Sequence, residues 1–348
     1  MATIDADAHV IETDQTWSYM QPEEQRFKPV TVAPTATEGG HQRYWIIDGQ
    51  LRARGGSERS HTSVASREML DVGERLRHMD ELGTDIQVLY PTVYTRKLTA
   101  SPAIDTALGR SYNRWMADVW RRGQGRLRWA MIPPLLDLDR APEELRFAKE
   151  NGACAIFMRG YESDKHLADP YFFPLYEEAS RLDLPICVHA GGANPVVVDF
   201  FNFGGTFLVS KIPVISAFHT LLLHQVPTKF PRLRFGFVEA TSQWLPHVLH
   251  DLVRRVDRLV EGDHVLRGEV SSEILGKNRM YVACQTDDDL DYVLQYAGED
   301  NLVMGTDYGH ADTSAELDAL NTLRRTSVVS AAVLDKILDD NPRALYGL

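Results

Sequence analysis

The sequence predicts an α/β protein built as a single TIM-like (β/α)8 barrel with insertions after the first and fifth strands. Three observations predict this fold. Short apolar runs recur eight times along the chain, and eight is the strand number of such a barrel. Amphipathic stretches separate these runs, an alternation typical of parallel strands joined by helices. The length of 348 residues suits one barrel with insertions, so we expect residues 1–348 to form one domain.

The expected strands are rich in Val, Ile, Leu and Phe, as strands buried on both faces are. In chain order they are "TIDADAHV" (3–10), "DIQVLYP" (85–91), "LRWAMIPP" (127–134), "ACAIFMR" (153–159), "LPICVHA" (184–190), "LRFGFVEA" (233–240), "RMYVACQT" (279–286) and "NLVMGTD" (301–307).

The stretches between these strands carry helix signals, with acids in the first turns and Gly or Asp near the end. Among them are "VGERLRHMDELG" (72–83), "AIDTALGRSYNRWMADVWRR" (103–122), "APEELRFAKENG" (141–152) and "PYFFPLYEEASRLD" (170–183).

Two segments interrupt the alternation of strands and helices. Residues 13–70 contain "RYWIIDGQLRARGG", in which Asp48-Gly49 predicts a hairpin turn. Residues 191–210 follow the fifth strand and are rich in Gly, Asn and Phe. Loops of this length in a compact domain are usually functional or mobile.

Composition narrows the class of protein. An apolar share of 44% and a charged share of 25% are typical of a globular protein. The net charge of -12 disfavours nucleic acid and anionic membranes as partners, so we expect a small-molecule substrate. Neither a membrane-length apolar run nor a signal-peptide layout is present, which predicts a cytoplasmic protein. The three cysteines, Cys154, Cys187 and Cys284, lie in strand-like runs and are expected to pack in the core.

Several expected strands end in polar residues suited to metal binding. Asp7 and His9 end the first strand, His189 the fifth, Glu239 the sixth and Asp307 the eighth. The carboxyl ends of barrel strands form one mouth, where active sites lie. Buried like charges repel unless a cation sits among them. We therefore expect a divalent transition metal, Zn, Mn or Fe, because these ions accept both carboxylate and imidazole ligands.

The sequence resembles the amidohydrolase superfamily, in the branch that holds the aminocarboxymuconate-semialdehyde and resorcylate-type decarboxylases. The motifs that carry this resemblance are "DADAHVIE" (5–12), "LPICVHAGG" (184–192), "GTDYGHAD" (305–312) and "DNPRALYGL" (340–348). The resemblance implies a barrel with one or two divalent ions per chain and a homo-oligomer, most simply a dimer. It also implies that Asp7, His9, His189 and Asp307 are metal ligands and that Asp307 carries a proton.

Two positions depart from the family pattern. Many members of the superfamily carry a carbamylated lysine at the end of the fourth strand, where this chain has Met158-Arg159-Gly160. The decarboxylases carry a histidine at the end of the sixth strand, where this chain has Glu239. A carboxylate beside a metal is itself a good ligand, so Glu239 could bring a second ion into the mouth.

The first hypothesis for function is metal-assisted hydrolysis of a small amide, ester or thioester. Asp307 and Glu239 would handle protons and metal, and His310 would act as an acid or pack nearby. Arg159 would either hold a substrate carboxylate or form a structural ion pair. Tyr90, at the end of the second strand, is expected to line the substrate pocket.

Three alternatives stay open. The metal site could instead serve non-oxidative decarboxylation of an aromatic or enoic acid, with Asp307 protonating carbon. It could hold two iron or manganese ions that react with oxygen. The protein could also be a paralogue that binds a ligand without catalysis.

Overall fold

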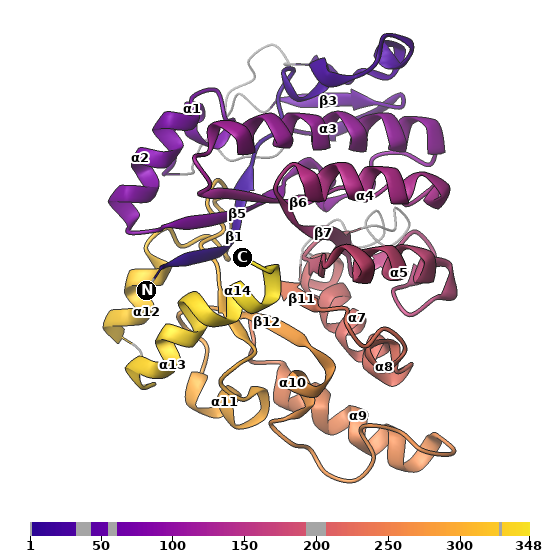
Figure 1. The fold of residues 1–348 in the computed structure, drawn as a ribbon, viewed down its shortest axis with the longest axis vertical. Helices are drawn as coiled ribbons and strands as arrows, with labels where there is room; N and C mark the ends of the chain where they lie inside the picture. Colours follow the sequence, from indigo (N-terminus) through magenta and orange to yellow (C-terminus); the bar gives the residue numbers. More distant parts are fainter. Residues whose placement is uncertain (1, 33–42, 55–60, 193–206, 327–328) are drawn as a thin grey trace.

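A computed structural model describes residues 2–32, 43–54, 61–192, 207–326 and 329–348. Eight strands form one parallel sheet that curves into a barrel, in the order in which they occur along the chain (Figure 1). They are β1 (Ile4–Val10), β5 (Ile86–Pro91), β6 (Leu127–Met131), β7 (Ala153–Arg159), β10 (Ile186–His189), β11 (Phe235–Val238), β12 (Met280–Cys284) and β13 (Leu302–Met304). The predicted (β/α)8 fold and its eight strands are confirmed.

The end of β13 meets β1 and nearly closes the barrel. The backbone N–H of His9 donates to the Tyr308 carbonyl at 2.7 Å, and that of Asp307 donates to the Asp7 carbonyl at 2.8 Å. Gly305 permits this approach, because a Cβ atom there would lie 2.3 Å from the Cβ of Asp7. The closure therefore places the first and last polar strand ends beside each other.

A shift of register in β1 separates Asp5 from the other polar residues of that strand. Asp5 pairs with Gln87 and Ala8 with Leu89, so three steps along β1 match two along β5. Such a bulge turns the residues before it away from the face that simple alternation assigns. The buried Asp5 carboxylate accepts hydrogen bonds from Gln87 Nε2 at 2.9 Å and from the Thr306 N–H at 2.9 Å.

Helices surround the strands (Figure 1). The longer ones are α2 (Val72–Leu82), α3 (Pro102–Arg122), α4 (Ala141–Glu150), α5 (Phe173–Leu182), α7 (Ile212–Leu223), α9 (Leu245–Leu259), α11 (Leu290–Ala297) and α12 (Ala319–Thr326). The shorter ones are α1 (Val64–Arg67), α8 (Val226–Lys229), α10 (Ile274–Asn278), α13 (Ala331–Asp335) and α14 (Asn341–Tyr346).

Local signals explain where helices begin and end. In α2 the Asp71 side chain accepts the Glu74 N–H at 3.1 Å, and the helix stops at Gly83, whose φ of 66° is left-handed. The C-terminal α14 lies against β1, where the Tyr346 hydroxyl donates to the Ala6 carbonyl at 2.7 Å (Figure 1). Cys154, Cys187 and Cys284 are buried and free, as predicted.

The insertion between β1 and α2 forms a small separate sheet. Its described part holds the 3-10 helices η1 (Thr16–Tyr19) and η2 (Pro22–Phe27) and an antiparallel sheet of β2 (Val30–Val32), β3 (Tyr44–Ile47) and β4 (Gln50–Ala53). Asp48 and Gly49 join β3 to β4 with φ of 51° and 70°, which confirms the predicted hairpin.

Most of the predicted insertion at 191–210 falls at residues 193–206, outside the described residues. Within the described part of the chain, no helix combines the length and apolar character needed to cross a membrane.

Candidate active site

The barrel brings five of the predicted site residues together at the carboxyl ends of four strands. The His9 Nε2 atom lies 3.6 Å from Asp7 Oδ1, 3.4 Å from Asp307 Oδ1 and 3.1 Å from His189 Nε2. His189 Nδ1 lies 3.3 Å from Glu239 Oε2. The convergence follows from β1, β10, β11 and β13 ending at the same rim of the barrel.

Backbone carbonyls orient both histidines. His9 Nδ1 lies 3.2 Å from the Pro91 carbonyl, and His189 Nδ1 lies 2.9 Å from the carbonyl of Ala190. A carbonyl oxygen only accepts hydrogen bonds, so each Nδ1 carries a hydrogen. In the neutral rings each Nε2 therefore presents its lone pair to the space shared with Asp7 and Asp307.

The Asp307 carboxylate is almost fully buried, with 3% of the residue exposed. Neither of its oxygens accepts a hydrogen bond from the described residues, and the same holds for Asp7 Oδ1. His310 Nδ1 lies 2.8 Å from Asp307 Oδ1 in an ion-pair contact, and the His310 ring stacks on His9 with centroids 3.8 Å apart. The other His310 nitrogen, Nε2, lies 2.9 Å from Thr92 Oγ1, which holds the ring in place.

A group of three acidic residues lies beside the histidines. Glu239, Asp307 and Asp312 each offer a carboxylate oxygen within 4.8 Å of the others. Both Glu239 and Asp307 have left-handed backbones, with φ of 59° and 51°. Non-glycine residues adopt this conformation at a cost of about 1 to 3 kcal/mol, and such strain clusters at functional sites.

Burial and crowding shift the ionisation of these groups. Burial raises the pKa of Asp307 well above its ordinary value, and the charge of Asp7 raises it further. Burial also raises the pKa of Glu239, to which Asp307 adds repulsion. Burial lowers the pKa of His9 well below its ordinary value. It also lowers that of His189, but the charges of Asp7 and Glu239 outweigh burial and raise the pKa to about 9.

These residues fit a divalent transition metal. Asp7, His9 and His189 form one candidate ligand group, and His9, Asp307 and His310 form another that shares His9. Two imidazole nitrogens and buried carboxylate oxygens without hydrogen-bond partners are the donor set that Zn, Mn or Fe accepts. A cation among them would also offset the repulsion between the buried acids.

A comparison with known protein families identifies the family to which this chain belongs. The model of the family described as Amidohydrolase matches residues 4–348. The chain belongs to the amidohydrolase family. The resemblance seen in the sequence is thereby confirmed, and no curated protein matches this amidohydrolase.

Solved structures similar to this amidohydrolase share its fold along the whole chain. An amidohydrolase from Mycobacterium avium subsp. paratuberculosis K-10 is 17% identical with a TM-score of 0.79, and the match covers 100% of this chain and 98% of that one. The 5-carboxyvanillate decarboxylase of Sphingomonas paucimobilis is 16% identical, with a TM-score of 0.69 and coverage of 100% and 99%. The 2,6-dihydroxybenzoate decarboxylase from Rhizobium is 15% identical, with a TM-score of 0.63 and coverage of 100% and 99%.

Arg159 does not present a free guanidinium to a substrate. Its Nε atom lies 3.1 Å from both carboxylate oxygens of Glu162, and its Nη2 atom pairs with the same side chain. Its Nη1 atom donates to the carbonyls of Tyr94 at 2.9 Å and Arg96 at 3.1 Å. Arg159 therefore forms a structural ion pair with Glu162, which is the second of the two alternatives expected for it.

Tyr90 lies against the two histidines of the site. The side chain is fully buried, and its hydroxyl lies 2.9 Å from that of Tyr346. The ring contacts His189 and His9, with centroid distances of 5.1 and 6.3 Å. Tyr90 therefore packs around the two histidines of the site, and its role in lining the substrate pocket stays a prediction.

Two residues of the site were missed from the sequence. Asp312 stands at the end of the "GTDYGHAD" motif and could have been found there as a further acid. Glu12 ends "DADAHVIE", and its fully buried carboxylate accepts the Thr92 N–H at 3.1 Å and the Val93 N–H at 3.0 Å. It thereby fixes the loop whose Thr92 hydroxyl contacts His310.

Proposed function

We propose that this amidohydrolase is a metal-dependent decarboxylase that removes carbon dioxide, without oxidation, from a small aromatic or enoic carboxylic acid. The observation that carries the proposal is the position of Asp307, a buried carboxylate whose Oδ1 atom lies 3.4 Å from His9 Nε2 and 2.8 Å from His310 Nδ1. Two structures with this fold belong to decarboxylases of ring carboxylic acids. Decarboxylation therefore replaces hydrolysis as the first hypothesis.

Four residues would hold the metal. His9 and His189 offer Nε2 atoms, and Asp7 and Asp307 offer carboxylate oxygens. When bound there, a divalent ion supplies positive charge that holds a substrate carboxylate and a neighbouring oxygen and stabilises negative charge.

Asp307 would supply the proton. As the bond between the substrate carbon and its carboxylate breaks, the electron pair stays on that carbon and takes the proton from the Asp307 carboxyl group, while carbon dioxide leaves. The position of Asp307 favours this role, because its carboxylate is buried beside His9 at the rim where the metal would hold the substrate. His310, 2.8 Å from Asp307 Oδ1, is placed to return a proton after each turnover.

A second candidate is hydrolysis, which the acidic group of Glu239, Asp307 and Asp312 favours. A cavity of about 10 Å³ beside it is lined in part by Asp7, Glu239, Asp307 and Ser314, and this volume suits one water molecule or ion. A second ion there would support activation of a water molecule.

The test is release of carbon dioxide by metal-loaded enzyme from a panel of hydroxybenzoates and enoic acids, run in parallel with ester and thioester substrates. The proposal expects release that depends on metal and on Asp307. Ester or thioester hydrolysis without any release of carbon dioxide would favour the second candidate.

A further inference from the structure

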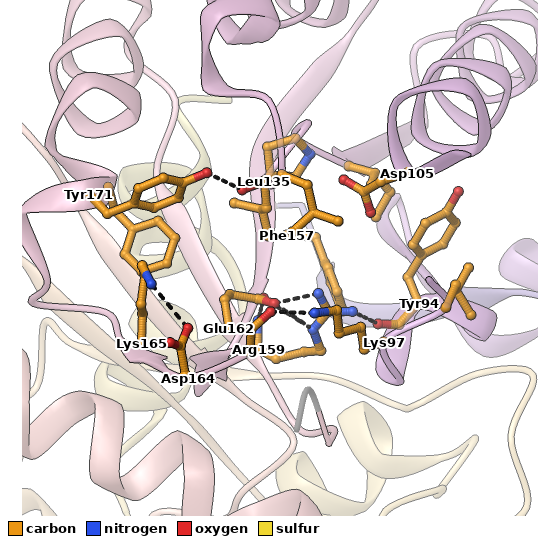
Figure 2. A pocket seen from close by; sticks show the side chains of 16 residues that line it. Tyr94, Lys97, Asp105, Leu135, Phe157, Arg159, Glu162, Asp164, Lys165 and Tyr171 are labelled. Carbon is orange, nitrogen blue, oxygen red and sulfur yellow. Dashed lines mark hydrogen bonds and ion pairs between the residues drawn. The ribbon is translucent and has the colours of Figure 1, made fainter. Parts of the chain in front are cut away.

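A separate cavity of about 170 Å³ opens beside the ends of β6 and β7 (Figure 2). We call it the ring cavity. Its walls are largely apolar and include Leu98, Ile132, Leu135, Phe157 and Phe172. An apolar cavity of about 150 Å³ accepts benzene in another protein. The ring cavity therefore has the size and lining to hold one six-membered ring.

The ring cavity adjoins the histidine site through β7. Phe157 lines the cavity, and its ring lies 5.7 Å from that of His189 between centroids. Arg159, another lining residue, is the neighbour of His189 in the pairing of β7 with β10. A ligand in the cavity would lie one side chain away from a candidate metal ligand.

The charges that line the cavity balance and are mostly paired. Three cations and three acids face it: Lys97, Arg159, Lys165, Asp105, Glu162 and Asp164. Arg159 pairs with Glu162, and Lys165 Nζ lies 3.0 Å from Asp164 (Figure 2). Because the lining carries no excess charge, it favours an uncharged group over a carboxylate or an ammonium group.

Asp105 is the acid of this lining that has no ion-pair partner within 4 Å among the described residues. Figure 2 shows it on the same side of the cavity as Tyr94, opposite Tyr171. Its Oδ2 atom is buried and has no hydrogen-bond partner among the described residues, and the same is true of the Tyr94 hydroxyl. A buried acceptor of this kind costs free energy unless a donor reaches it.

We propose that the ring cavity binds an uncharged ring bearing a hydroxyl or N–H group and that Asp105 Oδ2 accepts a hydrogen bond from that group. The inference rests on the proposed function in one respect only: the proposed function identifies the bound ring as part of the substrate. Binding itself is independent of turnover.

The test is a titration of the zinc-loaded full chain with 4-fluorophenol and with fluorobenzene, followed by fluorine NMR. We expect 4-fluorophenol to bind more tightly. Asp105→Ala should weaken 4-fluorophenol about tenfold, because a hydrogen bond to a charged group is lost, and should change fluorobenzene binding less than about twofold. Asp105→Asn, which keeps the size of the side chain, should weaken the phenol in the same direction.

Three further variants locate the probe. Leu136→Trp fills the cavity and should abolish binding of both probes, whereas Glu143→Gln, which removes one exposed acid of α4, should change neither. Binding should persist in the double variant His9→Ala, His189→Ala.

Phenol binding that survives Leu136→Trp, or that disappears with the two histidines, would place the probe at the metal and overturn the inference. So would equal losses for both probes in Asp105→Ala, or no binding of either probe to the wild type. A protein that binds the phenol in this way but releases no carbon dioxide would contradict only the proposed function.

Discussion

The Nε2 atoms of His9 and His189 face each other across 3.1 Å at the mouth of the barrel. Backbone carbonyls occupy both Nδ1 atoms, so in the neutral rings two lone pairs point at one place. That arrangement is unfavourable unless a proton or a cation lies between the rings. The charges of Asp7 and Glu239 raise the pKa of His189 to about 9, so the site favours a positive charge there, and a divalent metal would supply it.

Removal of both histidines should therefore remove the metal. For the double variant His9→Ala, His189→Ala we expect metal content below about a tenth of the wild-type value, because imidazole nitrogens give transition metals their main preference for such a site. Plasma mass spectrometry on protein purified without chelator measures the content. His247→Ala, an exposed histidine of α9, is the matched control and should keep the wild-type content. Unchanged metal in the double variant would place the ion elsewhere.

Asp307→Asn should separate proton transfer from metal binding. The variant keeps an oxygen donor of similar size but cannot deliver a carboxyl proton. We expect decarboxylation to fall about 10²- to 10⁴-fold, the usual contribution of a positioned general acid, while at least half of the metal stays bound through Asp7, His9 and His189. Parallel assays of carbon dioxide release and metal content measure both effects. A rate within about threefold of wild type would remove Asp307 from the proton-transfer step.

Glu239→Ala distinguishes one ion from two. A decarboxylase centre built on His9 and His189 needs one ion, so we expect one ion per chain in both the wild type and the variant. Metal counting on the two proteins, prepared side by side, gives the answer. Two ions in the wild type and one in Glu239→Ala would identify a second site at Glu239 and support hydrolysis.

Glu12 should make stability depend on pH. Burial raises its pKa from 4.5 to about 7, so the folded protein binds the proton more tightly than the unfolded chain does. The contribution of Glu12 to the free energy of unfolding therefore falls as pH rises from about 5 to 7, by about 3 kcal/mol at most. Glu12→Gln has no charge to bury, so its stability relative to wild type should increase over this range. Urea unfolding at pH 5 and pH 8 measures the difference, and Glu143→Gln should show none. A relative stability of Glu12→Gln that does not change with pH would contradict the buried-acid account.

The sequence predicts the barrel well because its signals are local. Each apolar run with a polar end marks one strand. The carboxyl ends of barrel strands share one rim, so His189 and Asp307 are predicted to lie at the same mouth without any knowledge of the loops. The turn at Asp48-Gly49 is local in the same way, because it depends on two adjacent residues that tolerate positive φ.

Features that depend on pairing between distant segments were not predicted. The bulge in β1, which removes Asp5 from the face of His9, depends on the register against β5. The carbonyls of Tyr94 and Arg96 that accept hydrogen bonds from Arg159 lie 65 and 63 positions away, and the contact between Tyr90 and Tyr346 joins residues 256 positions apart. Pattern rules carry no information on such contacts.

The most direct test of the account is the release of labelled carbon dioxide from carboxyl-labelled hydroxybenzoates and enoic acids, with metal-free, metal-reconstituted and reconstituted Asp307→Asn protein. The account predicts release by the reconstituted wild type, none without metal, and a loss of about 10²-fold or more in Asp307→Asn. Reconstituted protein with its full metal content that hydrolyses esters or thioesters but releases no carbon dioxide would contradict it.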